Sequence, residues 1–231
     1  MKKVSIVIPS YNEEKYIDGV LTSIYESDIK YPFEVIVADA STDSTRDIIK
    51  KHFPDVKIVK GGNVSEARNN GAKAAKGDYI IFIDADITFD DKKLINKTVK
   101  KLRKGYHMVT TKLKCRNNLI AHNIYKVCNF IQLFSVVEGM PFSTGCFMGV
   151  DKQKFFELGG FDETLHFAED YHLSRKIKRR KFWILIKSGV YTDDRRFQKM
   201  GYFGLMKEFI RIMRNRYKND DEFKRDIGYW S

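Results

Sequence analysis

Short apolar runs alternate with helix-like segments along the first part of the chain, and this alternation limits the fold more than any other feature. Four apolar runs predict strands, at residues 4–8, 33–38, 56–59 and 79–83. The segments between them carry apolar residues at helical spacing, at residues 13–26, 42–52 and 64–75. Strands that alternate with helices in this way indicate βαβ units. The sequence therefore predicts an α/β fold with a mainly parallel central sheet flanked by helices.

Polar residues follow three of the predicted strands. Residues 9–13 follow the first strand, residues 39–43 the second, and Asp84-Ala85-Asp86 the fourth. Ligands of parallel sheets bind at the carboxyl ends of strands, near the point where the strand order reverses. We therefore expect these three segments to face one cleft.

Asp84 and Asp86 place two carboxylates one residue apart at the end of a buried strand. Like charges at close range repel and raise each other's pKa, so the pair is costly without a cation. A hard divalent metal, Mg²⁺ or Mn²⁺, removes this conflict and can also hold a diphosphate. A solvated pair of carboxylates at a strand end is the alternative that this short motif leaves open.

Composition narrows the class of protein. The 231 residues fit one large domain or two small ones. The chain has no signal-peptide pattern after Met1 and no apolar stretch of ~20 residues, so we predict neither a signal peptide nor a transmembrane helix. Three cysteines without close pairing argue for a reducing compartment and against zinc or disulfides. We expect a cytoplasmic protein, with a peripheral position at the inner face of the membrane as the alternative.

The net charge of +12 comes mostly from the second half of the chain. Residues 92–116 contain ten Lys or Arg and no Asp or Glu. An anionic partner such as a nucleotide diphosphate, a phospholipid surface or nucleic acid would suit this charge. A solvated Lys-rich surface is the alternative. No recognised nucleic-acid motif accompanies the basic runs, so we expect no nucleic-acid partner.

We interpret residues 1–231 as a single domain in three parts. They are a nucleotide-sugar half at 1–105, an acceptor half at 106–200, and a C-terminal amphipathic helix with a tail at 201–231. The helix from Tyr202 to Lys218 has apolar residues on one face and basic residues on the other. Two interpretations stay open: it lies on an anionic membrane, or it packs its apolar face on the domain.

Five segments, in their order and spacing, resemble the family 2 glycosyltransferases with the GT-A (Rossmann-like) fold, over roughly residues 3–200. They are residues 4–14, residues 35–45, residues 67–71 with 77–86, residues 147–163, and residues 168–170. The resemblance implies an inverting transfer of sugar from a UDP- or GDP-linked donor to a glycan or lipid-linked acceptor. The motif Gln-x-x-Arg-Trp is absent from the chain, so processive polymer synthesis is disfavoured.

The resemblance also implies roles for individual residues at the donor site. Asp86, helped by Asp84, would hold Mg²⁺ or Mn²⁺ on the donor diphosphate. Asp39 would accept a hydrogen bond from an N–H of the donor's nucleobase, which favours uracil or guanine. Ala40 and Ser41 replace the family's usual second Asp and Gly at this turn. Further candidates for nucleotide-sugar binding are Pro9, Tyr11, Glu13, Ala85 and Glu169.

Three arginines are candidates for contact with the donor. Arg68 would pair with the base-binding carboxylate or with a phosphate, and a helix-surface position is the alternative. Arg195 and Arg196 follow a predicted strand and could clamp the diphosphate.

The catalytic base implied by the resemblance is Asp170, in the pair Glu169-Asp170. It would deprotonate the acceptor as the acceptor attacks the anomeric carbon. The alternative is that both acids only stabilise a helix N-terminus. His166 lies nearby and is either structural or close to the metal or substrate.

Two other functions stay as alternatives. A sugar-phosphate nucleotidyltransferase has a similar fold, but the turn at residues 9–12 contains no glycine for a phosphate loop. A non-catalytic nucleotide-sugar-binding module would be signalled by loss of the carboxylate motifs, and both motifs are present.

Overall fold

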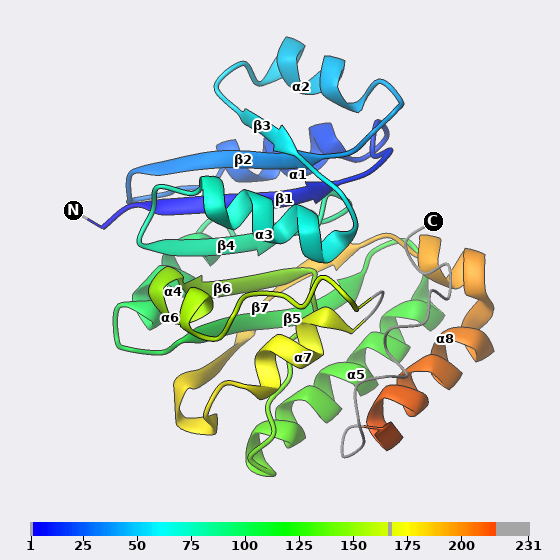
Figure 1. The fold of residues 1–231 in the computed structure, drawn as a ribbon. Helices are drawn as coiled ribbons and strands as arrows, with labels where there is room; N and C mark the ends of the chain where they lie inside the picture. Colours follow the sequence, from blue (N-terminus) through cyan, green and yellow to red (C-terminus); the bar gives the residue numbers. More distant parts are fainter. Residues whose placement is uncertain (1, 166–167, 216–231) are drawn as a thin grey trace.

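One seven-stranded sheet forms the centre of the molecule. The computed structural model describes residues 2–165 and 168–215. The strands are β1 (Val4–Ser10), β2 (Phe33–Asp39), β3 (Lys57–Lys60), β4 (Tyr79–Ile83), β5 (Met108–Cys115), β6 (Phe147–Asp151) and β7 (Phe182–Thr192). Their order across the sheet is β3-β2-β1-β4-β6-β5-β7, and only β6 among these seven runs against its neighbours (Figure 1). The predicted α/β fold with a mainly parallel sheet is confirmed.

Helices cover both faces of the sheet. They are α1 (Ile17–Tyr25), α2 (Thr45–His52), α3 (Val64–Ala74), α4 (Leu94–Leu102), α5 (Leu119–Val137), α6 (Lys152–Glu157), α7 (Glu169–Arg175) and α8 (Arg195–Asn215), with a 3₁₀ turn at Arg179–Lys181. One apolar core joins α1, α2, α4 and the start of α5 to one face. A second core joins α3, α6 and α7 to the other face. No helix of the described chain is long and apolar enough to cross a membrane.

Two predicted boundaries differ in ways that affect the site. Residues 13–16 form a turn before α1, because Asn12 adopts the left-handed conformation (φ 54°) and the backbone N–H of Tyr16 donates to Glu13. The last helix, predicted from residue 201, begins at Arg195 and is kinked at Gly201 (φ 69°). Arg195 therefore lies at a helix start and not in an extended loop.

The sheet brings the polar strand ends together, as predicted. Ser10 at the end of β1 pairs with Asp39 at the end of β2, and β4 runs parallel to β1 on its other side. A short bridge between Thr88 and Tyr191 ties the segment after β4 to the end of β7. Residues from β1, β2, β4 and β7 consequently meet at one edge.

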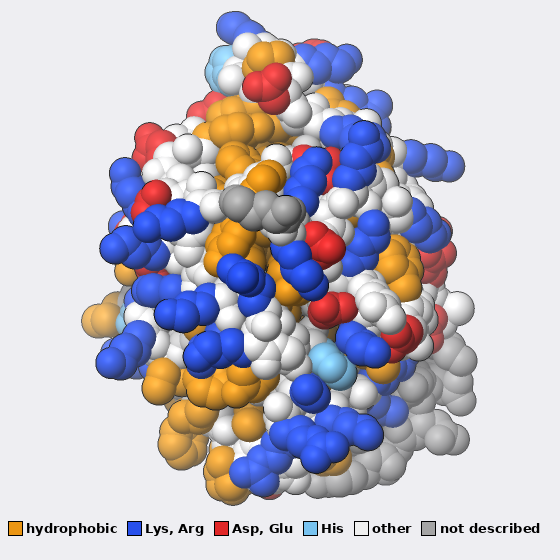
Figure 2. Space-filling view, turned by 90° about the vertical axis from the view of Figure 1, so that its left-hand side faces the viewer, with side chains coloured by type: hydrophobic (Ala, Val, Ile, Leu, Met, Phe, Trp, Pro, Cys, Tyr) orange, Lys and Arg blue, Asp and Glu red, His pale blue; other side chains and the backbone are white. Residues whose placement is uncertain are grey.

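Much of the positive charge lies at the opposite end of the molecule. Exposed Lys2, Lys76, Lys104 and Arg180 each precede a strand of the parallel set, so they lie at the amino ends of those strands. Figure 2 views this end, and Lys and Arg side chains gather across it. This part of the charge faces away from the polar strand ends, which agrees with a solvated surface.

Candidate functional site

Asp39 is buried at the end of β2 and already has several donors. The Ser41 hydroxyl lies 2.6 Å from Asp39 Oδ1, and the Arg46 guanidinium donates to both Oδ2 and the Asp39 carbonyl oxygen. The serine that departs from the family pattern thus supports this carboxylate directly. Arg46 was not a candidate from the sequence. The only sequence signal for its contact with Asp39 was its place early in the helix-like segment that follows Asp39. The role of Asp39 in base recognition stays a prediction.

Arg68 of α3 is completely buried between two acidic motifs. Its Nη2 lies 2.7 Å from Asp84 Oδ1, and its Nη1 donates to Glu169 Oε1. Burial lowers the pKa of Arg68, but the carboxylates of Asp84 and Glu169 outweigh burial, and the pKa is raised above its usual value. The predicted helix-surface position is wrong. Arg68 pairs with Asp84 and Glu169, and the predicted pairing with the base-binding carboxylate is not what the structure has.

Asp86 faces a different arginine. Arg195 Nη2 lies 3.2 Å from Asp86 Oδ2, and the Thr192 hydroxyl lies 3.3 Å from the same oxygen. Arg195 also makes a two-point contact with Glu13, at 2.9 and 3.0 Å, and its guanidinium lies over the Tyr16 ring. Burial raises the pKa of Glu13, while Arg195 lowers it in part.

Asp84 and Asp86 are therefore each neutralised by a separate guanidinium. The expected repulsion between them is relieved by Arg68 on one side and Arg195 on the other. The Arg195 guanidinium lies between the carboxylates of Glu13 and Asp86, and a divalent cation bound to Asp86 would have to take the same place.

The oxygen donors at this edge fit a Mg²⁺ or Mn²⁺ site that the substrate completes. Within residues 2–165 and 168–215 no group of three or more His, Cys, Asp or Glu could hold a metal by itself. Metals of this kind are commonly held by one or two carboxylates together with substrate phosphates. Asp86 is the better placed carboxylate, because its partner Arg195 is partly exposed and contacts it at 3.2 Å, whereas Asp84 is paired at 2.7 Å with the wholly buried Arg68.

Asp170 lies in the first turn of α7, beside the same arginine. Its Oδ1 accepts from the Tyr171 backbone N–H at 2.7 Å. Burial and the neighbouring charge of Glu169 raise the pKa of Asp170 to about 7, while Arg68 opposes the shift. Asp170 is partly exposed, whereas Glu169 is buried against Arg68. Glu169 therefore holds the arginine, and the predicted direct contact between Glu169 and the donor is not supported by this burial.

Gly145, which sequence analysis missed, makes this arrangement possible. A Cβ at this position would lie 2.7 Å from Arg68 Nη2 and 3.2 Å from Asp170 Oδ2. The Gly145 carbonyl oxygen also accepts from Arg68 at 3.4 Å. No sequence pattern signals this contact, because 77 residues separate the two partners.

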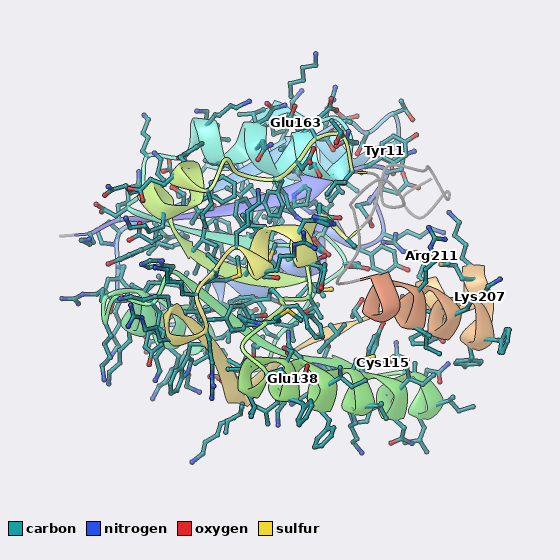
Figure 3. All side chains as sticks on the ribbon, turned by 60° about the horizontal axis from the view of Figure 1, so that its bottom comes forward. Tyr11, Cys115, Glu138, Glu163, Lys207 and Arg211 are labelled. Carbon is teal, nitrogen blue, oxygen red and sulfur yellow. The ribbon has the colours of Figure 1, made fainter. Side chains whose placement is uncertain are left out.

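The remaining predicted residues occupy different positions. Tyr11 is exposed beside the turn after β1, while Pro9 is half-buried and the Ala85 side chain is in the core. Figure 3 shows Tyr11 at the same end of the molecule as Lys207 and Arg211 of α8. The Arg196 side chain and the whole of His166 lie outside what the structure describes, so both stay predictions.

A family model decides the family. Residues 5–159, about two thirds of the chain, match the model of "Glycosyl transferase family 2". The chain belongs to glycosyl transferase family 2. Its relatives are named glycosyltransferases, which removes support from the nucleotidyltransferase alternative.

Two of the similar proteins match this chain over a limited segment. A poly(ribitol-phosphate) β-N-acetylglucosaminyltransferase, TarS of Staphylococcus aureus, is 36% identical over 94 residues, which are 37% of this chain and 16% of TarS. The putative teichuronic acid biosynthesis glycosyltransferase TuaG of Bacillus subtilis is 32% identical over 97 residues, which are 39% of this chain and 38% of TuaG.

Solved structures place this family 2 chain in the GT-A fold. The mannosyltransferase PcManGT from Pyrobaculum calidifontis, in complex with GDP-Man and Mn²⁺, superposes with a TM-score of 0.69 at 22% identity, over 91% of this chain and 64% of that chain. Residues 1–349 of S. aureus TarS, in complex with UDP-GlcNAc, give 0.63 at 22% identity, over 83% and 58%. At these identities the likeness concerns the fold.

Proposed function

We propose that this chain transfers a sugar, with inversion, from a UDP- or GDP-linked donor to a glycan or lipid-linked acceptor, with Mg²⁺ or Mn²⁺. One observation carries the proposal: Arg68 joins Asp84 of the donor-side motif to Glu169, next to Asp170. The family membership, a UDP-GlcNAc complex and a GDP-Man and Mn²⁺ complex among proteins of the same fold support it.

The donor binds at the strand ends in this proposal. Asp39 accepts from the base, and Tyr11 and Glu13 lie in the turn beside it. Asp86, with Asp84 behind it, would hold the cation, which would supply neutralising charge to the departing nucleoside diphosphate. Arg195 leaves Glu13 and Asp86 and turns to the phosphates, for which a guanidinium fork is well suited.

Asp170 acts as the base. With a pKa of about 7, a large part of this carboxyl is ionised at neutral pH and still basic enough to take the acceptor proton. Arg68 and Glu169 fix the start of α7, so the carboxylate is held in place before the acceptor arrives. The proton of the acceptor passes to Asp170 as the acceptor oxygen bonds to the anomeric carbon and the diphosphate leaves from the opposite face.

A donor screen tests the proposal. UDP- and GDP-sugars are added with Mn²⁺, with Mg²⁺ or with EDTA, and thermal shift and the nucleoside diphosphate released as the sugar passes to water or to an added glycan acceptor are measured. One donor should stabilise the protein only in the presence of metal. Asp170→Asn should keep this stabilisation and lose release by about 10²–10⁴-fold. Release at the parent rate by Asp170→Asn contradicts its role as base, and metal-dependent binding without any release supports the non-catalytic binding module.

A further inference from the structure

Helix α5 presents an apolar face to solvent. Among the described residues, half of the fourteen exposed large hydrophobic side chains lie on this one helix. They are Leu119, Ile120, Val127, Phe130, Leu133, Phe134 and Val137. Phe130 is 70% exposed and Leu119 is 74% exposed. A helix of a globular protein normally turns such residues to the core, so a patch of this kind marks an interaction surface.

The outward orientation of this face is fixed by contacts on the inner side of α5. Asn129 bonds the backbone of Leu113 in β5 twice, as acceptor at 2.9 Å and as donor at 2.8 Å. Tyr125 is buried and packs edge-on against Phe197 of α8. The helix therefore cannot rotate its exposed face inward without breaking these contacts.

Helix α8 continues the same surface. Figure 1 shows α5 and α8 close together at one side of the molecule, and Asn118 at the start of α5 donates to the Tyr202 hydroxyl at 2.8 Å. Phe203 and Ile210 of α8 are exposed. The predicted packing of α8 on the domain holds for Leu205, which lies against the core.

The charges that this surface presents are few, and Lys126 and Lys207 make them mainly positive. Residues 119–137 contain no Asp or Glu, and their single charged side chain is the exposed Lys126. Lys207 projects from α8, as Figure 3 shows, whereas Arg116 before α5 is paired with Asp90 at 2.7 Å and adds no net charge. Glu138 is the acidic residue at the far end of α5. An apolar stripe bordered by cations complements an anionic lipid surface, which offers both acyl chains and negative headgroups.

A second copy of this chain fits the surface less well. In a symmetric pair of α5 helices the Lys126 side chains of both copies would approach one another with no acidic residue on either helix to compensate.

We propose that the exposed face of α5, with the start of α8, docks on the surface of an anionic lipid bilayer. The contact then runs mainly through α5 and not through the Tyr202–Lys218 face considered from the sequence. Asn118, at the start of α5, also donates to Asp194, the residue before Arg195. The docked face is thus continuous with the segment that carries Arg195. If the proposed function is correct, docking brings a lipid-linked acceptor to Asp170, but docking itself does not depend on it.

Vesicle flotation of the full chain tests the proposal. Vesicles of phosphatidylcholine with phosphatidylglycerol should carry the protein, and vesicles of phosphatidylcholine alone should carry much less. Salt should weaken the binding, because the headgroup attraction is screened. Phe130→Glu should lower the partition constant by about tenfold or more, since it removes one buried large apolar side chain from the contact.

Phe156→Glu is the matched control, because Phe156 is an exposed apolar residue on α6, outside this surface. It should bind vesicles like the parent chain. Circular dichroism melting verifies that both variants fold, and Leu119→Gln replaces Phe130→Glu if the latter unfolds.

Three results would overturn the proposal. The first is that the parent chain fails to float with anionic vesicles. The second is that Phe130→Glu and Phe156→Glu float equally well. The third is that light scattering finds a dimer, that Phe130→Glu dissociates this dimer, and that vesicles fail to bind. The last result would assign the face to a second copy of this chain.

Discussion

Arg68 Nη2 lies 2.7 Å from Asp84 Oδ1 in a wholly buried contact, and the other end of the same guanidinium holds Glu169. One side chain of α3 thus links the segment after β4 to the start of α7. Because buried charges are stable only when they are paired, the three groups depend on one another for their positions.

Loss of Arg68 should destabilise the fold. Arg68→Met leaves Asp84 and Glu169 buried without this cation, which should lower the free energy of unfolding by about 3–5 kcal/mol. Urea denaturation measures the change. Lys73→Met, an exposed substitution on the same helix, is the control and should stay within about 0.5 kcal/mol of the parent chain. Equal effects of the two substitutions would contradict the importance of the buried contact.

Asp170 should make stability depend on pH. The pKa of this carboxyl rises from 3.8 to about 7 on folding, so the folded state binds more protons than the unfolded state between these values. Its ionisation therefore costs stability as pH rises through this window, and the loss levels off above about pH 7. Urea titrations should find that Asp170→Asn gains stability relative to the parent chain as pH rises from about 4 to about 7. A difference in the free energy of unfolding that does not change with pH would contradict the raised pKa of Asp170.

Removal of the Arg195 guanidinium should strengthen metal binding before the donor arrives. Arg195→Met frees the carboxylates of Asp86 and Glu13 from their hydrogen bonds with a positively charged guanidinium. A hydrogen bond to a charged group contributes about 1.5–3 kcal/mol. Calorimetric titration with Mn²⁺ alone should give an affinity about tenfold higher than in the parent chain. Lys207→Met removes a charge from α8 away from both carboxylates and should leave the affinity unchanged. A weaker affinity in Arg195→Met would show that Arg195 helps the cation site.

A methyl group at position 145 should displace Asp170, the proposed catalytic base. In Gly145→Ala the new Cβ meets Arg68 Nη2 and Asp170 Oδ2, so the first turn of α7 has to move. We expect sugar transfer to fall by about 100-fold, because small displacements of a reacting group are costly. Gly204→Ala is the control, since its Cβ would meet its nearest neighbour, the Met200 Cβ, at an ordinary 3.6 Å. Parent-like transfer by Gly145→Ala would refute the close packing at this glycine.

The sequence could predict which strand ends meet, but not the partners of the charged groups. Asp39, Asp84 and Asp86 follow apolar runs, and parallel strands force their carboxyl ends to one edge. Arg68 and Glu169 are 101 residues apart, and only the packing of α7 against α3 and the sheet brings them together. The resemblance named Arg68 as a functional candidate, whereas its burial between two acids depends on tertiary structure.

Two further differences have local causes. The turn at Asn12 delays α1, since its left-handed backbone cannot continue a right-handed helix. Arg195 lies at a helix start because the backbone N–H groups of Phe197 and Gln198 donate to the Asp194 carbonyl oxygen. The spacing of apolar residues carries no information on the Asn12 turn or on the hydrogen bonds to Asp194. It also did not predict which face of α5 would be exposed to solvent.

The reversed direction of β6 has a consequence for how such a chain can diversify. Strand β5 ends on the side of the sheet where the polar strand ends meet, and β6 begins on that same side, so residues 116–146 leave the sheet and return to it on one side. The length of this excursion can therefore change without shifting the strand register, provided that Gly145 and the contacts of α5 with β5 are kept. Variation in the exposed part of α5 should then change the surface beside the polar strand ends without rebuilding the sheet.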